Sequence, residues 1–285
     1  MALLQERSKY VPWQYIRFWS VLRYVAVSIA ALIALFPLYW IFVTSLLTAH
    51  DAFAIIPRFT PDWDWSNYTR AWSLAPWTQY FANSLFIAIC TIVLAVTTSL
   101  LAGYAFGMMK FPGRQLLFLA ILGLIMIPGE ATLIPSYLIV SGFNWIDTYQ
   151  AQIIPFGVSI SGIFLLRQFF MSLPPSLWEA AQLDGCSRFG FLWRIAAPLA
   201  RPALAVIALQ VFIGSWNAFL WPYLVTNSDA LRPVEVGLQA FISADGTDPT
   251  ALAAAAAFTT LPILVVFLIA QRQFIEGISV GSTKG

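Results

Sequence analysis

The chain has 285 residues, of which 60% are hydrophobic and 10% are charged, and its formal net charge is +2. A soluble domain of this size could hardly cover so much apolar surface with polar groups. The small net charge gives no indication of a nucleic-acid partner. One histidine and two distant cysteines, Cys90 and Cys186, suggest neither a metal site nor a disulfide framework.

Six long stretches with few or no charges follow one another along the chain. About 20 apolar residues cross a hydrocarbon core about 30 Å thick as a helix, and a helix satisfies its own backbone hydrogen bonds in lipid. One such stretch could be a buried helix of a soluble protein, but six in a row indicate a membrane protein. The sequence therefore predicts an all-α integral membrane fold with six transmembrane helices, at about residues 24–47, 82–106, 116–140, 149–167, 203–225 and 250–271.

The first apolar stretch needs a separate test, because an N-terminal hydrophobic segment can be a cleaved signal peptide. It runs from Tyr24 to Thr48, which is longer than a signal core of about 7–15 residues, so we expect it to be retained. No internal repeat or appended soluble domain is evident. Residues 1–285 are therefore expected to form a single transmembrane domain, with an N-terminal segment 1–23, a membrane region 24–271 and a tail 272–285.

The basic residues predict the orientation of the chain, since cytoplasmic loops carry an excess of Lys and Arg. With the N-terminus inside, the loops alternate sides after each span. Of the 15 lysines and arginines, only Arg58, Arg70 and Arg232 then fall outside. We therefore expect both ends of the chain to be cytoplasmic.

The longest predicted cytoplasmic loop, residues 171–190, is expected to contain a short helix with defined ends. Ser176 and Glu179 have the spacing of a capping box, in which each side chain satisfies a free backbone N–H of the first turn. The two prolines that precede the helix need no N–H partner, and Gly185 stands where a left-handed residue would end it. A helix of two turns is marginally stable alone, so we expect it to be held against the membrane surface or a partner.

The same loop resembles the EAA loop of ABC-importer permeases, whose pattern is E-A-A-x3-G-x9-I-x-L-P. The residues that match in register are Glu179, Ala180, Ala181, Gly185, Ile195 and Pro198. Ala197 replaces the usual leucine, which is expected to weaken packing slightly at the foot of the fifth span. The resemblance implies a coupling helix that docks in a cleft of a separate ATPase, with Leu183 and Asp184 also at the contact. An ordinary interfacial helix is the alternative.

The C-terminus, residues 271–285, resembles the tail Q-R-x-F-x-x-G-[IL]-x-x-G-[AS]-x-K-G of the smaller permease in carbohydrate-type (maltose-like) importers. Residues 127–135 and 214–222 are also typical of that subfamily, so the likeness extends from about residue 83 to the end of the chain. The tail of these permeases reaches between the ATPase subunits. By resemblance, the candidate contacts are Gly281, Lys284 and Gly285; a frayed, solvated tail is the alternative.

The resemblance also implies the partners and the setting. A permease of this type works with a second permease, two ATPase subunits and an extracytoplasmic solute-binding protein in a bacterial or archaeal plasma membrane, in contact with membrane lipid. The chain has no G-x-x-x-x-G-K-[ST] loop. We therefore expect it to be non-catalytic and without a cofactor of its own, with ATP and Mg²⁺ bound by the partner ATPase.

Two other functions stay open beside a carbohydrate permease. One is an ABC permease for a solute of the glycerol-phosphate type. The other is an ATP-independent secondary transporter, which belongs to a different class. Secondary carriers have no reason for a two-turn docking helix, and they more often show inverted repeats or intramembrane charge relays. The EAA loop therefore favours an ABC importer.

Glu130 and Asn217 are candidates for the translocation pathway. Each lies sixteen positions after the last basic residue before its span, Arg114 and Arg201 respectively. At about 1.5 Å per residue, both are expected at a similar depth, somewhat past the midplane toward the outside. An ionisable group at this depth is costly and usually faces a partner or a water-filled cavity.

Prolines on both sides of Glu130 support this assignment. Pro128 and Pro135 are expected to interrupt the third helix, and broken helices often border transport sites. We therefore expect Glu130, Trp216 and Asn217 to border the pathway, with Asn83 near its outer mouth. The alternative is that Glu130 only caps the broken helix.

Overall fold

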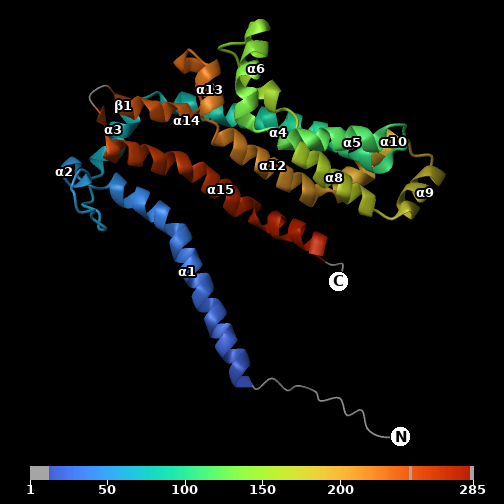
Figure 1. Ribbon diagram of the computed structural model, residues 1–285, viewed down its shortest axis with the longest axis horizontal. Coiled ribbons are helices and arrows are strands. Elements are labelled where there is room, and N and C mark those ends of the chain that lie inside the picture. The colour runs from blue at the N-terminus through green and yellow to red at the C-terminus, as the bar shows by residue number, and fades with distance from the viewer. Residues whose placement is uncertain (1–12, 244–245, 283–285) are drawn as a thin grey trace.

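The computed structural model describes residues 13–243 and 246–282, and the backbone in these ranges is predominantly helical (Figure 1). In chain order the helices are α1 (Trp13–Ser45), α2 (Ala49–Ala52), α3 (Ser66–Ser73), α4 (Trp77–Met108), α5 (Arg114–Gly123), η1 (Leu124–Met126), α6 (Gly129–Gly142), α7 (Tyr149–Ile153), η2 (Ile154–Phe156), α8 (Ile160–Ser172), α9 (Pro175–Leu183), α10 (Arg188–Phe191), the π-helix η3 (Leu192–Ala196), α11 (Ala197–Leu199), α12 (Arg201–Trp216), α13 (Leu220–Val225), η4 (Asp229–Leu231), α14 (Val234–Gly237), η5 (Leu238–Phe241) and α15 (Pro249–Ser282). Two short strands, β1 (Ile242–Ser243) and β2 (Gly246–Thr247), form an antiparallel pair.

Four helical segments are long and apolar enough to cross a membrane. They are Ser20–Ser45, Trp77–Met108, Tyr149–Ser172 and Pro249–Gln271. Two further pairs of helices pass the same criterion together but are bent, Arg114–Met126 with Gly129–Gly142 by 102° and Arg188–Leu199 with Arg201–Trp216 by 78°. The protein is therefore an all-α membrane protein with four to six spans. This confirms the predicted fold class, while the exact number of six spans stays a prediction.

The bend in the third predicted span lies where Pro128 was expected to break it. Ile127 and Pro128 are both extended, with ψ of 118° and 138°, so the chain leaves η1 and enters α6 in a new direction. The expected interruption at Pro135 is wrong, because this proline lies inside the continuous helix α6. A proline within a helix removes one backbone hydrogen bond, and here the helix tolerates that loss.

The fifth predicted span, 203–225, is also corrected. The helix α12 ends at Trp216, with Asn217 as its C-cap, and α13 begins separately at Leu220. Pro222 cannot donate the backbone N–H that a continuous helix would need at that position. Hydropathy alone does not detect such a break, because the residues around it are apolar.

Close helix packing forms the centre of the molecule. The glycines of α4 face α8 so closely that a Cβ added at Gly103 would lie 2.6 Å from the Cβ of Leu166, and one at Gly107 would lie 2.9 Å from the Cβ of Phe170. Small residues at a helix interface allow two backbones to approach in this way. The pair α4 and α8 is thereby held at short range, and α12 packs against both helices.

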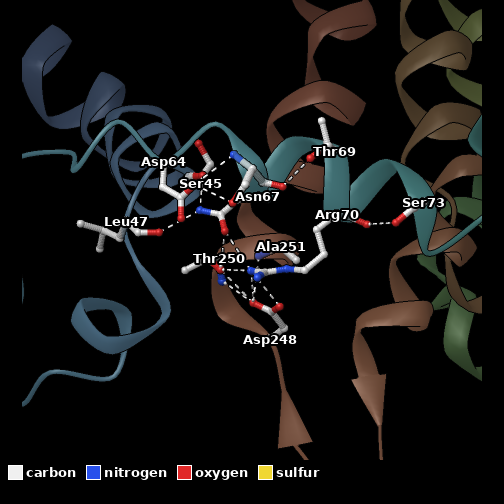
Figure 2. A network of polar contacts seen from close by, with 11 residues as sticks. Ser45, Leu47, Asp64, Asn67, Thr69, Arg70, Ser73, Asp248, Thr250 and Ala251 are labelled. Atoms are coloured by element: carbon white, nitrogen blue, oxygen red, sulfur yellow. Dashed lines mark hydrogen bonds and ion pairs between the residues drawn. The ribbon is translucent and has the colours of Figure 1, made fainter.

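Within residues 20–45, whose burial is described, α1 packs against the rest of the protein near its C-terminal end. Val43 and Leu46 are fully buried, whereas residues 21–39 are exposed. In Figure 1, α1 runs beside α15 at this end and then leaves the other helices. A polar network around Asn67, drawn in Figure 2, fixes the joint between α1, α3 and α15. In Figure 1, this joint and α9 lie at opposite ends of the bundle.

Candidate functional site

The helix α9 in the predicted cytoplasmic loop has a different N-terminus from the one expected. It begins at Pro175 with Pro174 as the N-cap, and no side chain caps it. Ser176 therefore lies inside the first turn, and the predicted capping box is wrong. Proline at the first helical position has a φ that already suits the helix and lacks an N–H that would need a partner, so the helix starts there without a polar cap.

The C-terminus of α9 ends as predicted at a left-handed glycine. Gly185 has a φ of +73°, which a residue with a side chain rarely adopts. The N–H of Gly185 donates to the carbonyl of Gln182 at 3.0 Å, and the N–H of Cys186 donates to that of Ala181 at 2.9 Å. These two bonds are a Schellman motif. They turn the chain sharply back toward the bundle after α9.

One face of α9 is braced against the bundle. Ala181 is buried in an apolar cluster that also contains Phe170 and Phe191. The ring of Trp178 meets the ring of Phe191 edge to face, with 5.2 Å between centroids. The guanidinium of Arg188 lies 5.5 Å from the centroid of Trp178, within the range of a cation–π contact. The helix is therefore fixed in place by side chains of the loop and of α8.

The opposite face of α9 is free. Glu179, Ala180 and Asp184 are exposed, and the side chain of Leu183 is 90% exposed. Phe189, in the following helix α10, is 66% exposed. Leu183 and Phe189 are thus two large apolar side chains exposed in the same loop region. The arrangement suits docking far better than it suits a helix packed within its own chain.

The rest of the EAA-like pattern leads from this loop into α12. Ile195 is half-buried against the same apolar cluster, Ala197 belongs to it with 8% exposure, and Pro198 is exposed. The chain passes through the π-helix η3 before the 78° bend into α12. The smaller side chain of Ala197 is accommodated inside the cluster, and its effect on packing strength stays a prediction.

The C-terminal candidates are only partly described. Gly281 lies on α15, which continues to Ser282 and so extends beyond the expected end of the span at residue 271. Lys284 and Gly285 lie outside the described residues. The tail contact with an ATPase stays a prediction.

Two of the four pathway candidates are buried and bonded within the chain. Asn83 is 1% exposed, and its side-chain nitrogen donates to the carbonyls of Ala230 at 2.8 Å and Arg232 at 2.9 Å. Its side-chain oxygen accepts a hydrogen bond from the Tyr149 hydroxyl at 2.8 Å. Trp216 is 2% exposed, and its indole N–H donates to the carbonyl of Thr259 at 3.1 Å. Both side chains join helices to one another.

The other two candidates, Glu130 and Asn217, are exposed. Glu130 lies in the first turn of α6, where a carboxylate interacts favourably with the positive end of the helix dipole. This position fits the alternative that Glu130 supports the start of the broken helix. The similar membrane depth expected for Glu130 and Asn217 was derived by counting residues along straight helices. The 102° bend before α6 means that this count does not apply to Glu130.

A cavity with a mixed polar and apolar lining lies between α4, α7, α8 and α12, with a volume of about 400 Å³. Its polar lining includes Ser84, Thr91, Gln152, Ser161, Gln210 and Ser215. None of the four pathway candidates lines it, although Asn83, Trp216 and Asn217 are each adjacent in sequence to a lining residue. The prediction from sequence missed these uncharged residues. The spacing of Ser84, Ile87 and Thr91 on α4 places all three on one helix face and was a usable signal.

The apolar helices define a multi-pass membrane protein, and its loop helix α9 is braced on one face and exposed on the other. Residues 95–280 match the family model of the binding-protein-dependent transport system inner membrane component. The chain belongs to this family and is a permease subunit of an ABC importer. It is accordingly a multi-pass inner-membrane protein.

Curated relatives match over most of their length. The arabinooligosaccharides transport system permease protein AraQ of Bacillus subtilis (strain 168) is 32% identical over 259 residues, which cover 90% of this chain and 92% of the relative. The sn-glycerol-3-phosphate transport system permease protein UgpE of Yersinia enterocolitica (serotype O:8 / biotype 1B) is 33% identical over 264 residues, covering 90% and 94%.

Two solved structures share the fold. One is a bacterial ABC transporter involved in the import of the acidic polysaccharide alginate, with a TM-score of 0.78, 26% identity, and coverage of 96% of this chain and 100% of that chain. The other is a bacterial alginate ABC transporter in complex with a periplasmic protein that holds an alginate pentasaccharide. It has a TM-score of 0.56 and 16% identity, and covers 91% and 95%. At that identity the second likeness concerns the fold alone.

Proposed function

We propose that this permease forms half of the translocation pathway for a carbohydrate or related solute, and that α9 is the coupling helix that receives the motion of a separate ATPase. The observation that carries the coupling role is the two-sided character of α9. One face is anchored through Ala181 and Trp178, and the other presents Leu183 at 90% exposure. A helix that transmits force needs both a rigid attachment and a free docking face.

The apolar cluster under α9 connects it to the membrane helices. Besides Ala181, the cluster contains Tyr104 of α4, Phe170 of α8 and Ile207 of α12. Because packed side chains resist compression, a displacement of α9 would move these helices together. Closure of an ATPase dimer would in this way rock the permease between inward-open and outward-open states.

The proposed assembly contains a second permease, two ATPase subunits that bind ATP and Mg²⁺, and an extracytoplasmic solute-binding protein. The relatives' names support carbohydrate or glycerol phosphate as the solute class. The family's binding-protein-dependent transport supports the solute-binding partner. An ATP-independent carrier is disfavoured, because the family is defined by binding-protein-dependent transport.

The proposed topology has six spans within a single membrane domain, each bent helix pair counting as one span, and both termini in the cytoplasm. The distribution of Lys and Arg supports this orientation, since 12 of the 15 then lie inside. Docking contacts are proposed at the exposed residues of α9 and, on the resemblance, at Gly281, Lys284 and Gly285. Glu130 and Asn217 keep a proposed place on the pathway because both are exposed, whereas Asn83 and Trp216 would position its walls.

A matched pair of leucine variants tests the coupling role. Leu183→Asp places a charge on the free face of α9 without touching its anchored face. Leu74→Asp makes the same change at the C-cap of α3, where the leucine is 48% exposed at the opposite end of the bundle. Each variant is purified from detergent extract, its co-purifying chains are identified, and ATPase activity is measured.

We expect Leu183→Asp to lose the ATPase and keep the second permease, while Leu74→Asp keeps both. If Leu183→Asp retains the ATPase in full, α9 is not the coupling helix. Loss of the ATPase in both variants would likewise count against the proposal, because the effect would not be specific to α9.

A further inference from the structure

The loop between α2 and α3, residues 53–65, exposes several large apolar side chains close to one another in the chain. Ile55 is 99% exposed and Ile56 is 80% exposed, and the values for Phe53 and Phe59 are 70% and 55%. Single apolar side chains on a surface are ordinary, whereas a larger exposed group marks a contact with a protein, a ligand or a membrane. The position of the loop relative to α1 shows which contact applies here.

Ion pairs hold the two ends of this loop together at the end of α1. The guanidinium of Arg58 lies 2.7 Å from the Asp51 carboxylate and 3.1 Å from that of Asp62. The Asp62 carboxylate also accepts from the backbone N–H of Thr48 at 3.1 Å, and the N–H of Asp62 donates to the carbonyl of Leu46 at 3.1 Å. The exposed apolar side chains therefore belong to a closed loop with defined ends and not to a loose segment.

The loop contacts α1 at two different levels, and in Figure 1 it lies beside the C-terminal part of this helix. The N–H of Asp64 donates to the carbonyl of Leu46, just beyond the end of α1, at 3.1 Å. The Tyr39 hydroxyl donates to the carbonyl of Phe59, and the Phe59 ring meets the Trp40 ring edge to face with 5.5 Å between centroids. At about 1.5 Å per residue, Phe59 lies about 10 Å further toward the N-terminus of α1 than Asp64 does.

The level of Tyr39 and Trp40 corresponds to the edge of the hydrocarbon core. Arg23 is the last charged residue before the apolar part of α1. About 20 residues cross a core about 30 Å thick, so a core that begins after Arg23 ends near residue 43, about one helical turn beyond Trp40. Tyrosine and tryptophan are enriched at this boundary. The loop therefore extends from the headgroup layer to the edge of the acyl chains.

The backbone of the loop also fits this boundary. An irregular backbone exposed to lipid is excluded from the hydrocarbon core, because its polar groups would have no partners there. The Phe59 carbonyl is satisfied by Tyr39, and Pro57 has no N–H. At the boundary, the other backbone groups reach headgroups and water while the side chains of Ile55 and Ile56 enter the acyl chains.

Lipid suits this surface better than a protein partner does. A water-soluble solute-binding protein has no access to the acyl-chain edge. Protein contacts within a membrane are enriched in small residues, which let backbones approach closely, whereas the exposed side chains of residues 53–59 are mostly large. The only charged side chain among residues 53–59 is that of Arg58, and two carboxylates already neutralise it. The surface is also continuous with the exposed apolar residues 21–39 of α1.

We propose that residues 53–59 form an interfacial anchor that inserts Ile55 and Ile56 into the membrane leaflet at the C-terminal end of α1, which is the outer leaflet in the proposed topology. The anchor fixes the depth of α1 at the end where this helix packs against the rest of the protein. Interfacial anchors of this kind also restrict the tilt of a span. The anchor is independent of the solute and of the coupling role of α9.

Photochemical labelling of the complete transporter in its own membranes tests the anchor. A phenylalanine that carries a diazirine replaces Ile55 or Ile56 in turn, and both side chains are so exposed that little packing is lost. Light expels dinitrogen from the diazirine, and the resulting carbene inserts into a C–H or O–H bond of the molecule next to it. The products are identified by mass spectrometry. The matched control replaces Thr69, an exposed residue of α3 beside the ion pair of Arg70.

We expect the mass of a phospholipid to be added at positions 55 and 56, and the mass of water at position 69. Addition of water at all three positions would place the loop in the aqueous phase and overturn the anchor. Cross-links from positions 55 and 56 to the second permease or to the solute-binding protein would overturn it as well, because the loop would then belong to a protein interface. Equal phospholipid labelling at position 69 would show that this loop is not a particular anchor.

The amount of co-purified ATPase is measured on every sample. Absence of the ATPase from the wild-type preparation rejects the proposed function and leaves the anchor standing if phospholipid adducts form. Retained ATPase without phospholipid adducts at positions 55 and 56 rejects the anchor and leaves the proposed function intact.

Discussion

Arg70 on α3 and Asp248, directly before α15, form an ion pair in which the guanidinium Nη2 lies 3.0 Å from the carboxylate Oδ2 (Figure 2). The other carboxylate oxygen of Asp248 accepts from the N–H groups of Thr250 and Ala251, and thereby caps α15. Arg70 also donates to the side-chain oxygen of Asn67 at 2.9 Å. One arginine thus connects the cap of a membrane helix to the residue that holds the end of α1.

Asn67 is the centre of this network and should be sensitive to substitution. It is 1% exposed, and its side-chain nitrogen donates to the carbonyls of Ser45 at 3.0 Å and Leu47 at 2.8 Å. Asn67→Ala leaves both carbonyls unpaired, and we expect a loss of about 1–3 kcal/mol in the free energy of unfolding. Thermal unfolding in detergent measures the loss. Thr69→Ala, which removes an exposed hydroxyl from the same helix, is the control. Equal melting temperatures for the two variants would contradict the central role of Asn67.

Asp147 should stabilise the fold at neutral pH and lose this effect in acid. The backbone N–H of Ser228, followed by that of Asn227 and the Ser228 hydroxyl, holds the pKa of the Asp147 carboxyl below its ordinary value. The folded pKa is then lower than the unfolded one, so the contribution is present above about pH 3.9 and disappears as the pH falls through the folded pKa.

Asp147→Asn isolates this contribution, because asparagine tolerates the backbone φ of 61° at this position. We expect the variant to melt at a lower temperature than wild type at pH 7, with the difference shrinking as the pH falls below about 3.9. Melting curves between pH 7 and the acid limit of the detergent sample provide the test. A difference that is constant over this interval would show that the charge of Asp147 is not responsible.

Glu235 should show the opposite dependence. Burial in α14 raises the pKa of its carboxyl above the ordinary value, so the ionised form destabilises the folded state. The folded pKa now exceeds the unfolded one, and the relative stability present below about pH 4.3 is lost as the pH rises through the folded pKa. Glu235→Gln should therefore melt above wild type at pH 7 and match it below about pH 4.3. If Glu235→Gln melts below wild type at pH 7, the ionised carboxylate of Glu235 stabilises the folded state, and the prediction is wrong.

The contact between α4 and α8 should not tolerate a methyl group. Gly103→Ala places a Cβ 2.6 Å from the Cβ of Leu166, a backbone-linked atom that cannot rotate away. We expect the overpacking to cost about 1–3 kcal/mol of unfolding free energy. Gly123→Ala is a matched control, because a Cβ there meets no atom within 4 Å and the residue already has a helical φ of −58°. Similar melting temperatures for both alanine variants would mean that α4 and α8 separate easily.

Several local features could be predicted from the sequence because short-range chemistry determines them. The break at Pro128 follows from the missing N–H of proline and its effect on the preceding residue. The end of α9 at Gly185 follows from the ease with which glycine adopts a positive φ. The spans follow from apolar length. In each case the deciding residues lie within a few positions of the feature that they produce.

The errors have a common physical cause. Pro135 and the break after Trp216 depend on how the surrounding helices accommodate a lost hydrogen bond, which the hydropathy of the segment does not express. The depth estimate for Glu130 and Asn217 likewise assumed straight helices, which the 102° bend before α6 contradicts. Asn83 instead uses its amide to join α4 to α7 and to the segment before α14, contacts that lie 66 or more positions away in the chain.

The sequence by itself determined that this protein is a helical membrane protein with a short helix that ends at Gly185, since apolar length, charge distribution and the EAA-like pattern are all visible along the chain. Only the tertiary structure decided which face of α9 is anchored and which polar residues share a cavity. Thr91 and Gln152 come from separate helices, and neither carries a charge that would distinguish it from any other polar residue in a span. Their place on one cavity depends on helices that pack together across long sequence separations, and no local sequence pattern predicts such packing.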